Sequence, residues 1–226
     1  MTLLSQNIVN ITDTAFLGHV GEVELGASAI GGVFYMAIYM IGFGFSQGSQ
    51  ILISRRNGEK RLLEIGKIFN NGLIFNFLLA SVICFICYFS MSSILKLMVS
   101  SEKIYNASIQ FLNWRIYGLI FAFINLMFRA FFVGITKTKV LSISSIITAV
   151  VNIILGYLLI FGKLGFSEMG IIGAAIASNV AEVATTIYLI IYSLKKEKIR
   201  QYNLFSFIRI DLQIIKVTLK ISVYIM

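Results

Sequence analysis

At 226 residues the chain is long enough for one or two soluble domains, but its composition excludes a soluble protein. Hydrophobic residues make up 58% of the chain and charged residues only 13%, against about 25% charged residues in soluble domains. The net charge of +9 comes from basic residues that lie in short stretches between apolar runs, as in membrane proteins. We therefore expect an all-α, polytopic membrane helix bundle that contacts lipid and has no nucleic-acid partner.

Apolar stretches near the length needed to cross a hydrocarbon core of about 30 Å follow one another along the chain. We predict six spans, at residues 2–18, 28–53, 68–91, 110–134, 141–162 and 171–193. The first is short for a span, and a seventh begins near residue 214 and stops at the last residue, so we interpret both as truncated. We expect a six-helix lobe at 1–193, a cytoplasmic linker at 194–213 and the start of a second lobe at 214–226. Residues 91–113 predict an amphipathic surface connection.

The first span contains an acid, in the segment ITDTAFLGHVGE at residues 11–22. A carboxylate such as that of Asp13 costs at least roughly 2.5–3.5 kcal/mol at the middle of a bilayer, so it indicates a function. Gln6 and Asn10 precede Asp13 at steps of four and three residues, which places all three on one helical face. This stripe predicts a face turned toward the bundle interior or a water-filled cavity.

Similar polar stripes recur in the later spans. The fifth span has Ser145, Thr148 and Asn152, the sixth has Ser178, Glu182, Thr185 and Thr186, and the fourth has Asn125 and Arg129. At 1.5 Å per residue, Asp13, Asn152, Ser178 and Glu182 all fall in the outer half of the bundle. We predict a cation or proton site at these four residues. Candidates for a substrate cavity are Gln6, Asn10, Gln47, Asn125 and Arg129. For each Ser, Thr or Asn, a hydrogen bond between helices is the alternative interpretation.

The basic residues predict the orientation of the chain. Fourteen lysines and arginines lie in 54–67, in 135–140 and after 194, whereas the alternate loops hold three. Because cytoplasmic loops carry the excess of Lys and Arg, we place these three segments and the N-terminus in the cytoplasm. The prediction is a multi-pass protein of the inner (plasma) membrane.

Five motifs in this order resemble the multidrug and toxic compound extrusion (MATE) family. They are NIVNITDTAFLGHVGEVELGASAI (7–30), GSQILISRRNGE (48–59), FRAFFVGITKTK (128–139), VNIILGYLLIFG (151–162) and GIIGAAIASNVAE (170–182). The first motif is most similar to the DNA-damage-inducible branch. The resemblance implies two six-span lobes that export drugs or organic cations against a proton or sodium gradient. This chain matches the first lobe, so the resemblance also implies a missing C-terminal lobe.

The resemblance further implies roles for individual residues. The family's first-lobe cation site uses an acid on the first helix, an Asn and an Asp four residues apart on the fifth, and a Thr on the sixth. Asp13 matches the acid, Asn152 matches the Asn and Ser178 takes the place of the Thr. Gly156 stands where the family has the Asp, which leaves Na⁺ binding at Asp13 and Asn152 in doubt and favours H⁺ as the coupling ion. Glu182 is a candidate replacement carboxylate, and no other cofactor is expected.

The leading hypothesis is therefore a cation-coupled antiporter for drugs or organic cations. One alternative is a non-transporting fragment or a half-transporter that acts by pairing. Another is a lipid-linked oligosaccharide flippase of the same superfamily, although such proteins offer a strongly cationic cavity and this chain has only Arg115 and Arg129 inside its spans.

An enzyme is not expected. His19, the sole histidine, falls in the predicted outer loop and has no Ser, Cys or acid arranged around it as a triad. Cys84 and Cys87 form a CFIC motif inside an apolar run without metal-ligand partners, so we interpret them as small apolar residues of a spanning helix.

Overall fold

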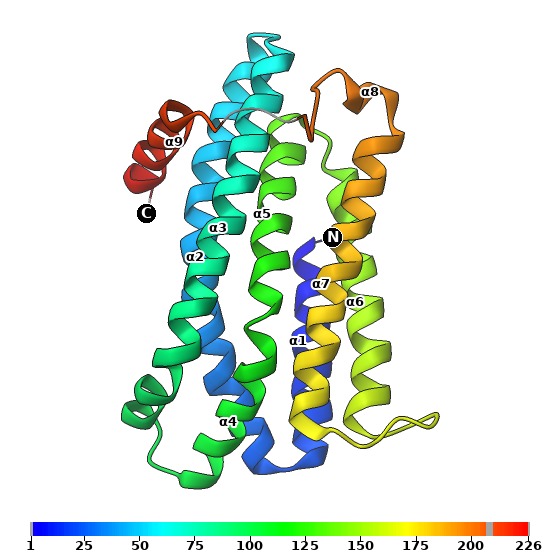
Figure 1. Ribbon diagram of the computed structural model, residues 1–226. Helices are drawn as coiled ribbons and strands as arrows, with labels where there is room; N and C mark the ends of the chain where they lie inside the picture. The colour runs from blue at the N-terminus through cyan, green and yellow to red at the C-terminus, as the bar shows by residue number, and fades with distance from the viewer. Residues whose placement is uncertain (1, 207–209, 226) are drawn as a thin grey trace.

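The structure, a computed structural model, describes the backbone of residues 2–206 and 210–225. Within these ranges the side chains are described except for those of residues 2–7, 10 and 225. The side-chain predictions for Gln6 and Asn10 therefore lie outside the described residues. Every regular element in the described ranges is a helix, which confirms the all-α fold (Figure 1). The helices are α1 (Thr2–Val20), α2 (Glu22–Gly58), α3 (Leu62–Met98), α4 (Glu102–Arg115), α5 (Gly118–Gly134), α6 (Lys139–Ile160), α7 (Gly170–Lys195), α8 (Glu197–Arg200) and α9 (Leu212–Ile225).

Several of these helices have the length and hydropathy of membrane spans. Among the described residues, α2, α3, α6 and α7 are long and apolar enough to cross a bilayer. The bent pair α4 and α5 meets the same criteria as one unit. The 19-residue α1 is not among the candidate spans found in the described residues.

The span predicted at 110–134 is a bent pair of helices in the structure, and it begins earlier in the chain, at Glu102. The chain bends by 54° between α4, which ends at Arg115, and α5, which begins at Gly118. At Gly118 a Cβ atom would collide with the side-chain oxygen of Asn179 and with the guanidinium of Arg115. At the bend, the Gly118 backbone therefore packs directly against the polar contact between Arg115 of α4 and Asn179 of α7. Hydropathy alone does not predict such a contact.

The surface connection predicted at 91–113 is shorter in the structure, because most of these residues are helical. α3 continues to Met98, and α4 starts at Glu102, so only a short turn separates two helices. The helical stretch continues because residues up to Leu95 on α3 remain buried against the bundle.

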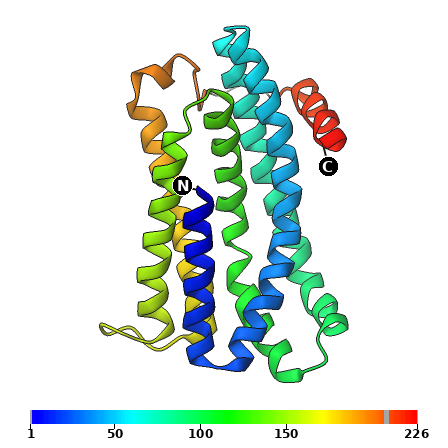
Figure 2. The same ribbon diagram turned by 180° about the vertical axis from the view of Figure 1, so that it is seen from behind.

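The helices run along one long axis and expose two distinct ends (Figures 1 and 2). One end, which we call the basic end, carries the connections α2–α3, α5–α6 and α7–α8. The opposite end carries the connections α1–α2, α3–α4 and α6–α7. The three Lys- and Arg-rich segments of the sequence therefore lie at the same end of the molecule, as a common side of the membrane requires.

Ion pairs tie the basic end together between α2 and α3. Glu59 pairs with Arg55 and Arg56, and Glu64 pairs with Arg56 and Arg61. Hydrogen bonds from Arg56 and then Arg55 hold the pKa of the Glu59 carboxyl below its usual range. The pairs are exposed, so they contribute little to stability and act mainly by closing the short α2–α3 turn.

An aromatic core fills the half of the bundle near the basic end. The Phe69 ring of α3 lies 5.2 Å from each of the Phe128 and Phe131 rings of α5, measured between centroids. The segment after α8 closes this core, because the Tyr202 ring packs edge-on against Phe131 at 5.4 Å. Its backbone passes so close to Gly66 that a side chain there would collide with the Tyr202 carbonyl. The core holds α3, α5 and α7 in place below the cavity described next.

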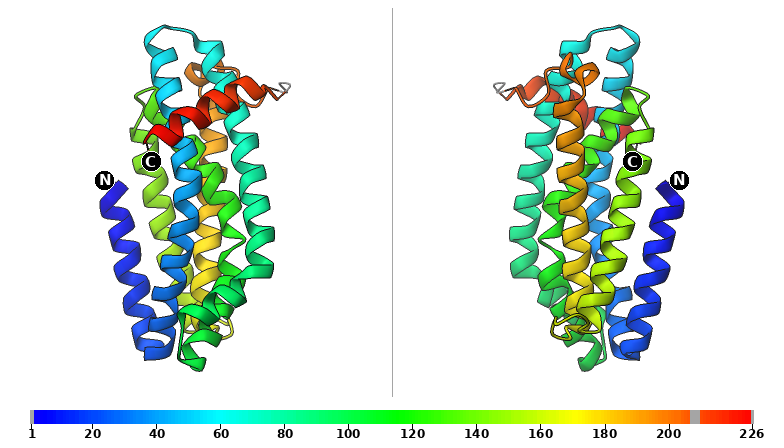
Figure 3. Two further views of the ribbon diagram at one scale, coloured as in Figure 1. Left: turned by 90° about the vertical axis from the view of Figure 1, so that its left-hand side faces the viewer. Right: turned by 90° about the vertical axis from the view of Figure 1, so that its right-hand side faces the viewer.

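α1 and α9 lie at the edges of the bundle (Figure 3). The N-terminal end of α1 leans away from its neighbours, whereas its other end packs on α6 and α2. His19 lies in the last turn of α1, where its Nδ1 is 2.8 Å from the Ala15 carbonyl oxygen, and not in a loop as predicted. α9 packs across α2 at Gly48, which has no side chain to block Thr218 and Ser222.

Candidate cation and substrate cavity

A cavity of about 870 Å³ runs between the helices of the bundle. Its walls come from α1, α2, α4, α5, α6 and α7, so segments from nearly the whole chain contribute to it. Six of the nine predicted site residues line this cavity: Asp13, Asn125, Arg129, Asn152, Ser178 and Glu182. The polar stripes of four different helices therefore face one common space, which is large enough for a drug-sized molecule.

Asp13 stands on the α1 wall beside the polar faces of α6 and α7. The Asn152 side-chain amide donates a hydrogen bond to the Ser178 hydroxyl at 3.0 Å, which joins α6 to α7. Asn152 is also a hydrogen-bonding neighbour of the Asp13 carboxylate. Among the described residues, no donor reaches the buried Asn152 Oδ1. This oxygen is therefore free to accept a hydrogen bond.

Glu182 occupies a second polar cluster, on α7 opposite α5. The Asn125 side-chain amide donates to Glu182 Oε2 at 2.8 Å, and the Thr186 hydroxyl donates to Asn125 Oδ1 at 2.9 Å. One turn along α7, the hydroxyls of Thr148 and Thr185 lie 2.6 Å apart. Glu182 faces the same cavity as Asp13, but its hydrogen bonds lead to α5 and not to the Asp13 cluster.

Gly156 is not among the residues that line the cavity. A Cβ atom built there would lie 3.8 Å from two ring atoms of Phe16, which is ordinary van der Waals contact. The Phe16 ring in turn packs against Tyr157 and Phe161, with centroids 6.0 and 5.6 Å away. The position at which the resemblance implies a second carboxylate therefore lies against apolar side chains, those of Phe16 and Ile160.

Arg115 is a cavity residue that our site prediction omitted. It is the last residue of α4, and its guanidinium carbon lies 3.9 Å from the Tyr35 ring centroid. Its Nη1 donates to the Asn179 side-chain oxygen at 2.9 Å. An arginine three residues before a glycine, inside an apolar run, was the available signal. Only the bend between α4 and α5 reveals that the side chain points inward.

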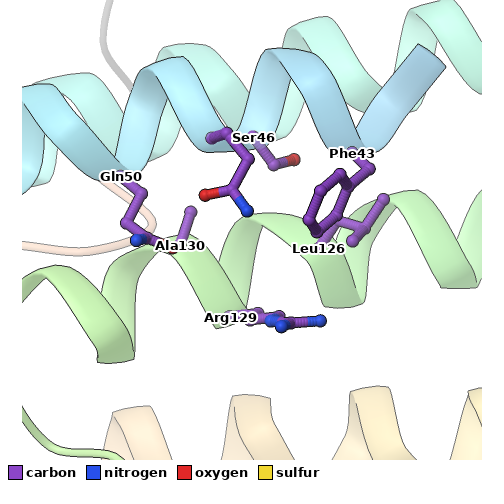
Figure 4. A pocket seen from close by; sticks show the side chains of 7 residues that line it. Phe43, Ser46, Gln50, Leu126, Arg129 and Ala130 are labelled. Carbon is purple, nitrogen blue, oxygen red and sulfur yellow. The ribbon is translucent and has the colours of Figure 1, made fainter. Parts of the chain in front are cut away.

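Gln47 belongs to a separate, small recess between α2 and α5 (Figure 4). This recess has room for about 10 Å³ and is lined by Phe43, Ser46, Gln47, Gln50, Leu126, Arg129 and Ala130. Arg129 lines both spaces, and its guanidinium carbon lies 5.6 Å from the Phe43 ring centroid. The structure therefore separates Gln47 from the large cavity, with Arg129 next to both.

A family model described as MatE matches residues 1–158, which is more than half of the chain. The chain belongs to the MatE family. Among curated relatives, the probable multidrug resistance protein NorM of Bacillus cereus (strain ATCC 14579) is 27% identical over 206 residues. That match covers 91% of this chain and 46% of NorM. The probable multidrug resistance protein YoeA of Bacillus subtilis (strain 168) is 28% identical over 200 residues, covering 87% of this chain and 43% of YoeA.

Solved MATE structures have the same fold as this chain. A MOP superfamily transporter from Pyrococcus furiosus superposes with a TM-score of 0.88 at 20% identity and covers 98% of this chain and 48% of its own. An outward-facing multidrug resistance MATE family transporter superposes with a TM-score of 0.85 at 21% identity, covering 98% and 49%. This chain thus spans about half the length of the proteins it matches. It is a multi-pass membrane protein of a transporter family and not an enzyme.

Proposed function

We propose that this MATE chain forms the ion-binding lobe of a cation-coupled antiporter that exports drugs or organic cations. The observation that carries the proposal is the shared cavity, which places Asp13 and Glu182 in one space large enough for a small organic molecule. Two acids in a partly enclosed cavity attract an organic cation, and the aromatic side chains of α2 offer it cation–π contacts. Because the chain spans about half of its relatives' length, we propose that export also needs a second lobe.

We propose H⁺ as the coupling ion and Asp13 as the residue that carries it. A protonated Asp13 is neutral, whereas the ionised carboxylate carries a negative charge beside the Asn152 side chain. Protonation therefore removes the charge that holds a cationic substrate, and loss of the proton restores that charge. Gly156 supports the preference for H⁺ over Na⁺, because its aromatic surroundings supply no second carboxylate to hold a metal ion.

We further propose that the basic end faces the cytoplasm of the inner membrane. The Lys and Arg side chains of its loops would then obey the positive-inside rule. The cavity reaches Thr138 and Leu141 near this end, so it would be loaded from the cytoplasmic side.

The test is ethidium transport into proteoliposomes that contain the chain together with a second lobe, the C-terminal half of a MATE relative, under an imposed pH gradient. With this second lobe present, the unchanged chain should transport ethidium when the gradient is applied, and Asp13→Asn should abolish this coupled transport. Ser28→Ala is the matched control, because Ser28 lines the cavity but its hydroxyl bonds within α2, to Leu25 at 2.8 Å.

Two results would contradict the proposal. Undiminished transport by Asp13→Asn would remove Asp13 from the coupling mechanism. Transport driven by a sodium gradient at constant pH would show that the coupling ion is Na⁺ and not H⁺. If the chain transports ethidium without an added second lobe, a half-transporter that acts by pairing with a second copy is the better description. Transport of a lipid-linked oligosaccharide in place of ethidium would favour the flippase.

A further inference from the structure

We propose that Arg115 is a tethered counter-cation, a specificity-determining side chain that competes with incoming cations for Asp13 and Glu182. This inference deepens the proposed function and rests on it, since it assumes that the cavity binds cations. It assigns to α4 a role in selecting and releasing the cation. The polar stripes of α1, α6 and α7 do not predict that role.

The guanidinium of Arg115 is held by three helices. Its Nη1 donates to Asn179 Oδ1 of α7 at 2.9 Å, and its carbon lies 3.9 Å above the Tyr35 ring of α2. Asn179 is fixed in turn, because its amide nitrogen donates to the Trp114 carbonyl oxygen at 2.6 Å, at the end of α4. The last carbonyl groups of a helix lack partners within that helix, so this contact ties the end of α4 to α7.

Gly118 provides the space for this arrangement. A Cβ atom at this position would collide with both Arg115 and Asn179. The bend after α4 and the missing side chain at Gly118 together let the guanidinium enter the cavity. Arg115 is therefore held in a defined place and is not a flexible surface side chain.

The charge of Arg115 acts on both acids of the cavity. Arg115 lines the same cavity as Asp13 of α1 and Glu182 of α7, and its positive charge interacts with both carboxylates. Arg129 lines the same cavity, one turn along α5 from the Asn125 that bonds Glu182, and its charge acts on Tyr39. One fixed positive charge thus offsets two negative charges that come from different helices.

A counter-cation in this position weakens the binding of every external cation that approaches the two acids. In a partly buried cavity, two like charges a few ångströms apart repel by several times more than they do in water. The effect lowers affinity without closing the cavity. It stabilises the empty site, so that a bound organic cation is released more readily when Asp13 is protonated.

The experiment measures binding of tetraphenylphosphonium to the full chain in lipid nanodiscs at low sodium concentration. Arg115→Gln should tighten binding about tenfold, because removing one like charge from a partly buried site changes the interaction by that order. Arg115→Lys keeps the charge and should bind like the unchanged chain. Arg129→Gln is the matched control: it removes the same charge from the same cavity, and its effect should be much smaller.

Three outcomes would overturn the counter-cation role. The first is that Arg115→Gln binds tetraphenylphosphonium no more tightly than the unchanged chain does, including the case in which neither binds it. Equal tightening by Arg115→Lys and Arg115→Gln is the second, since the charge would then not be the cause. Equal tightening by Arg129→Gln is the third. If Arg115→Gln loses the helical circular dichroism of the folded chain, Arg115→Met is measured instead, because its side chain preserves contact with Tyr35.

This test separates the two proposals. Tighter binding by Arg115→Gln without any pH-driven ethidium transport would support the counter-cation and contradict the antiporter. Transport that depends on Asp13, combined with unchanged binding in Arg115→Gln, would support the antiporter and contradict the counter-cation.

Discussion

At the scale of single residues, Gly156 illustrates how packing decides what a position can do. The resemblance to the family implies an acid there, yet the nearest atoms are those of the Phe16 ring, in a cluster with Tyr157 and Phe161. A carboxylate at this position would replace apolar packing without gaining a hydrogen-bond donor from that cluster. Asp13 and Glu182 therefore remain the acids of the cavity.

We predict that Gly156→Asp lowers the free energy of unfolding by about 1–3 kcal/mol, because it buries a polar group without a partner. Gly156→Ala is the control. Its Cβ atom fits beside Phe16 at 3.8 Å, and alanine in a helix is favoured over glycine by roughly 0.5–1 kcal/mol. Thermal unfolding in detergent, followed by size-exclusion chromatography, distinguishes the two variants. Equal stability of both would show that the aromatic cluster opens to accept the acid.

At the scale of elements, the bend between α4 and α5 is the feature that shapes the cavity. It ends one helix at Arg115 and starts the next at Gly118, so that two amphipathic pieces replace one straight span. Asn179 of α7 reaches both the Trp114 carbonyl and the Arg115 guanidinium across this bend. The bend therefore depends on contacts between α4 and α7 as much as on the local sequence.

We predict that Gly118→Ala destabilises the protein by about 1.5–3 kcal/mol, the range for losing a hydrogen bond to a charged group. The added methyl group displaces the side chains of Arg115 and Asn179. Gly58→Ala is the control, since a Cβ atom at the end of α2 meets no atom within 4 Å. The measurement is again thermal unfolding in detergent. A Gly118→Ala variant as stable as Gly58→Ala would mean that the contact does not hold α4 to α7.

The packing of α9 on α2 leads to a second prediction at this scale. Thr218 and Ser222 are buried against Gly48, where any side chain would collide with them. Gly48→Leu should therefore displace α9 and expose the segment before it to protease, whereas Gly58→Leu should not. Limited trypsin digestion, with cleavage sites identified by mass spectrometry, measures the difference. Unchanged cleavage in Gly48→Leu would argue that α9 is not held at this contact.

At the scale of the whole molecule, the distribution of charge predicts how the bundle sits in the membrane. The connections rich in Lys and Arg share the basic end, and the opposite end carries few basic residues. Cytoplasmic loops of membrane proteins carry such an excess. The orientation is therefore a property of all loops together and not of any single residue.

We predict that Lys60→Cys is protected from a membrane-impermeant maleimide in intact cells, whereas Ser167→Cys is labelled. Both positions are exposed, and they lie at opposite ends of the bundle. The background carries Cys84→Ala and Cys87→Ala, because these are the two native cysteines. Permeabilised cells provide the control for labelling at Lys60→Cys. The reverse labelling pattern would place the basic end outside the cell.

Much of this architecture follows from local patterns in the sequence. Apolar runs and helical periodicity are properties of neighbouring residues, so they predicted the helices and the polar faces that carry Asp13, Asn152, Ser178 and Glu182. The structure places these four residues around one cavity. Their role in ion binding stays a prediction, as does the division of the chain into a lobe, a linker and the start of a second lobe.

The sequence by itself determined the all-α class, the membrane setting and the polar faces, because hydropathy and the 3.6-residue period act over short distances. Only the tertiary structure decided which faces meet. It paired Glu182 with Asn125, placed Gly156 against the Phe16 ring, and brought Arg115 to Asn179 across 64 positions of sequence. Such contacts depend on the bend of one helix and on the space left by a glycine, and neither leaves a periodic signal in the chain.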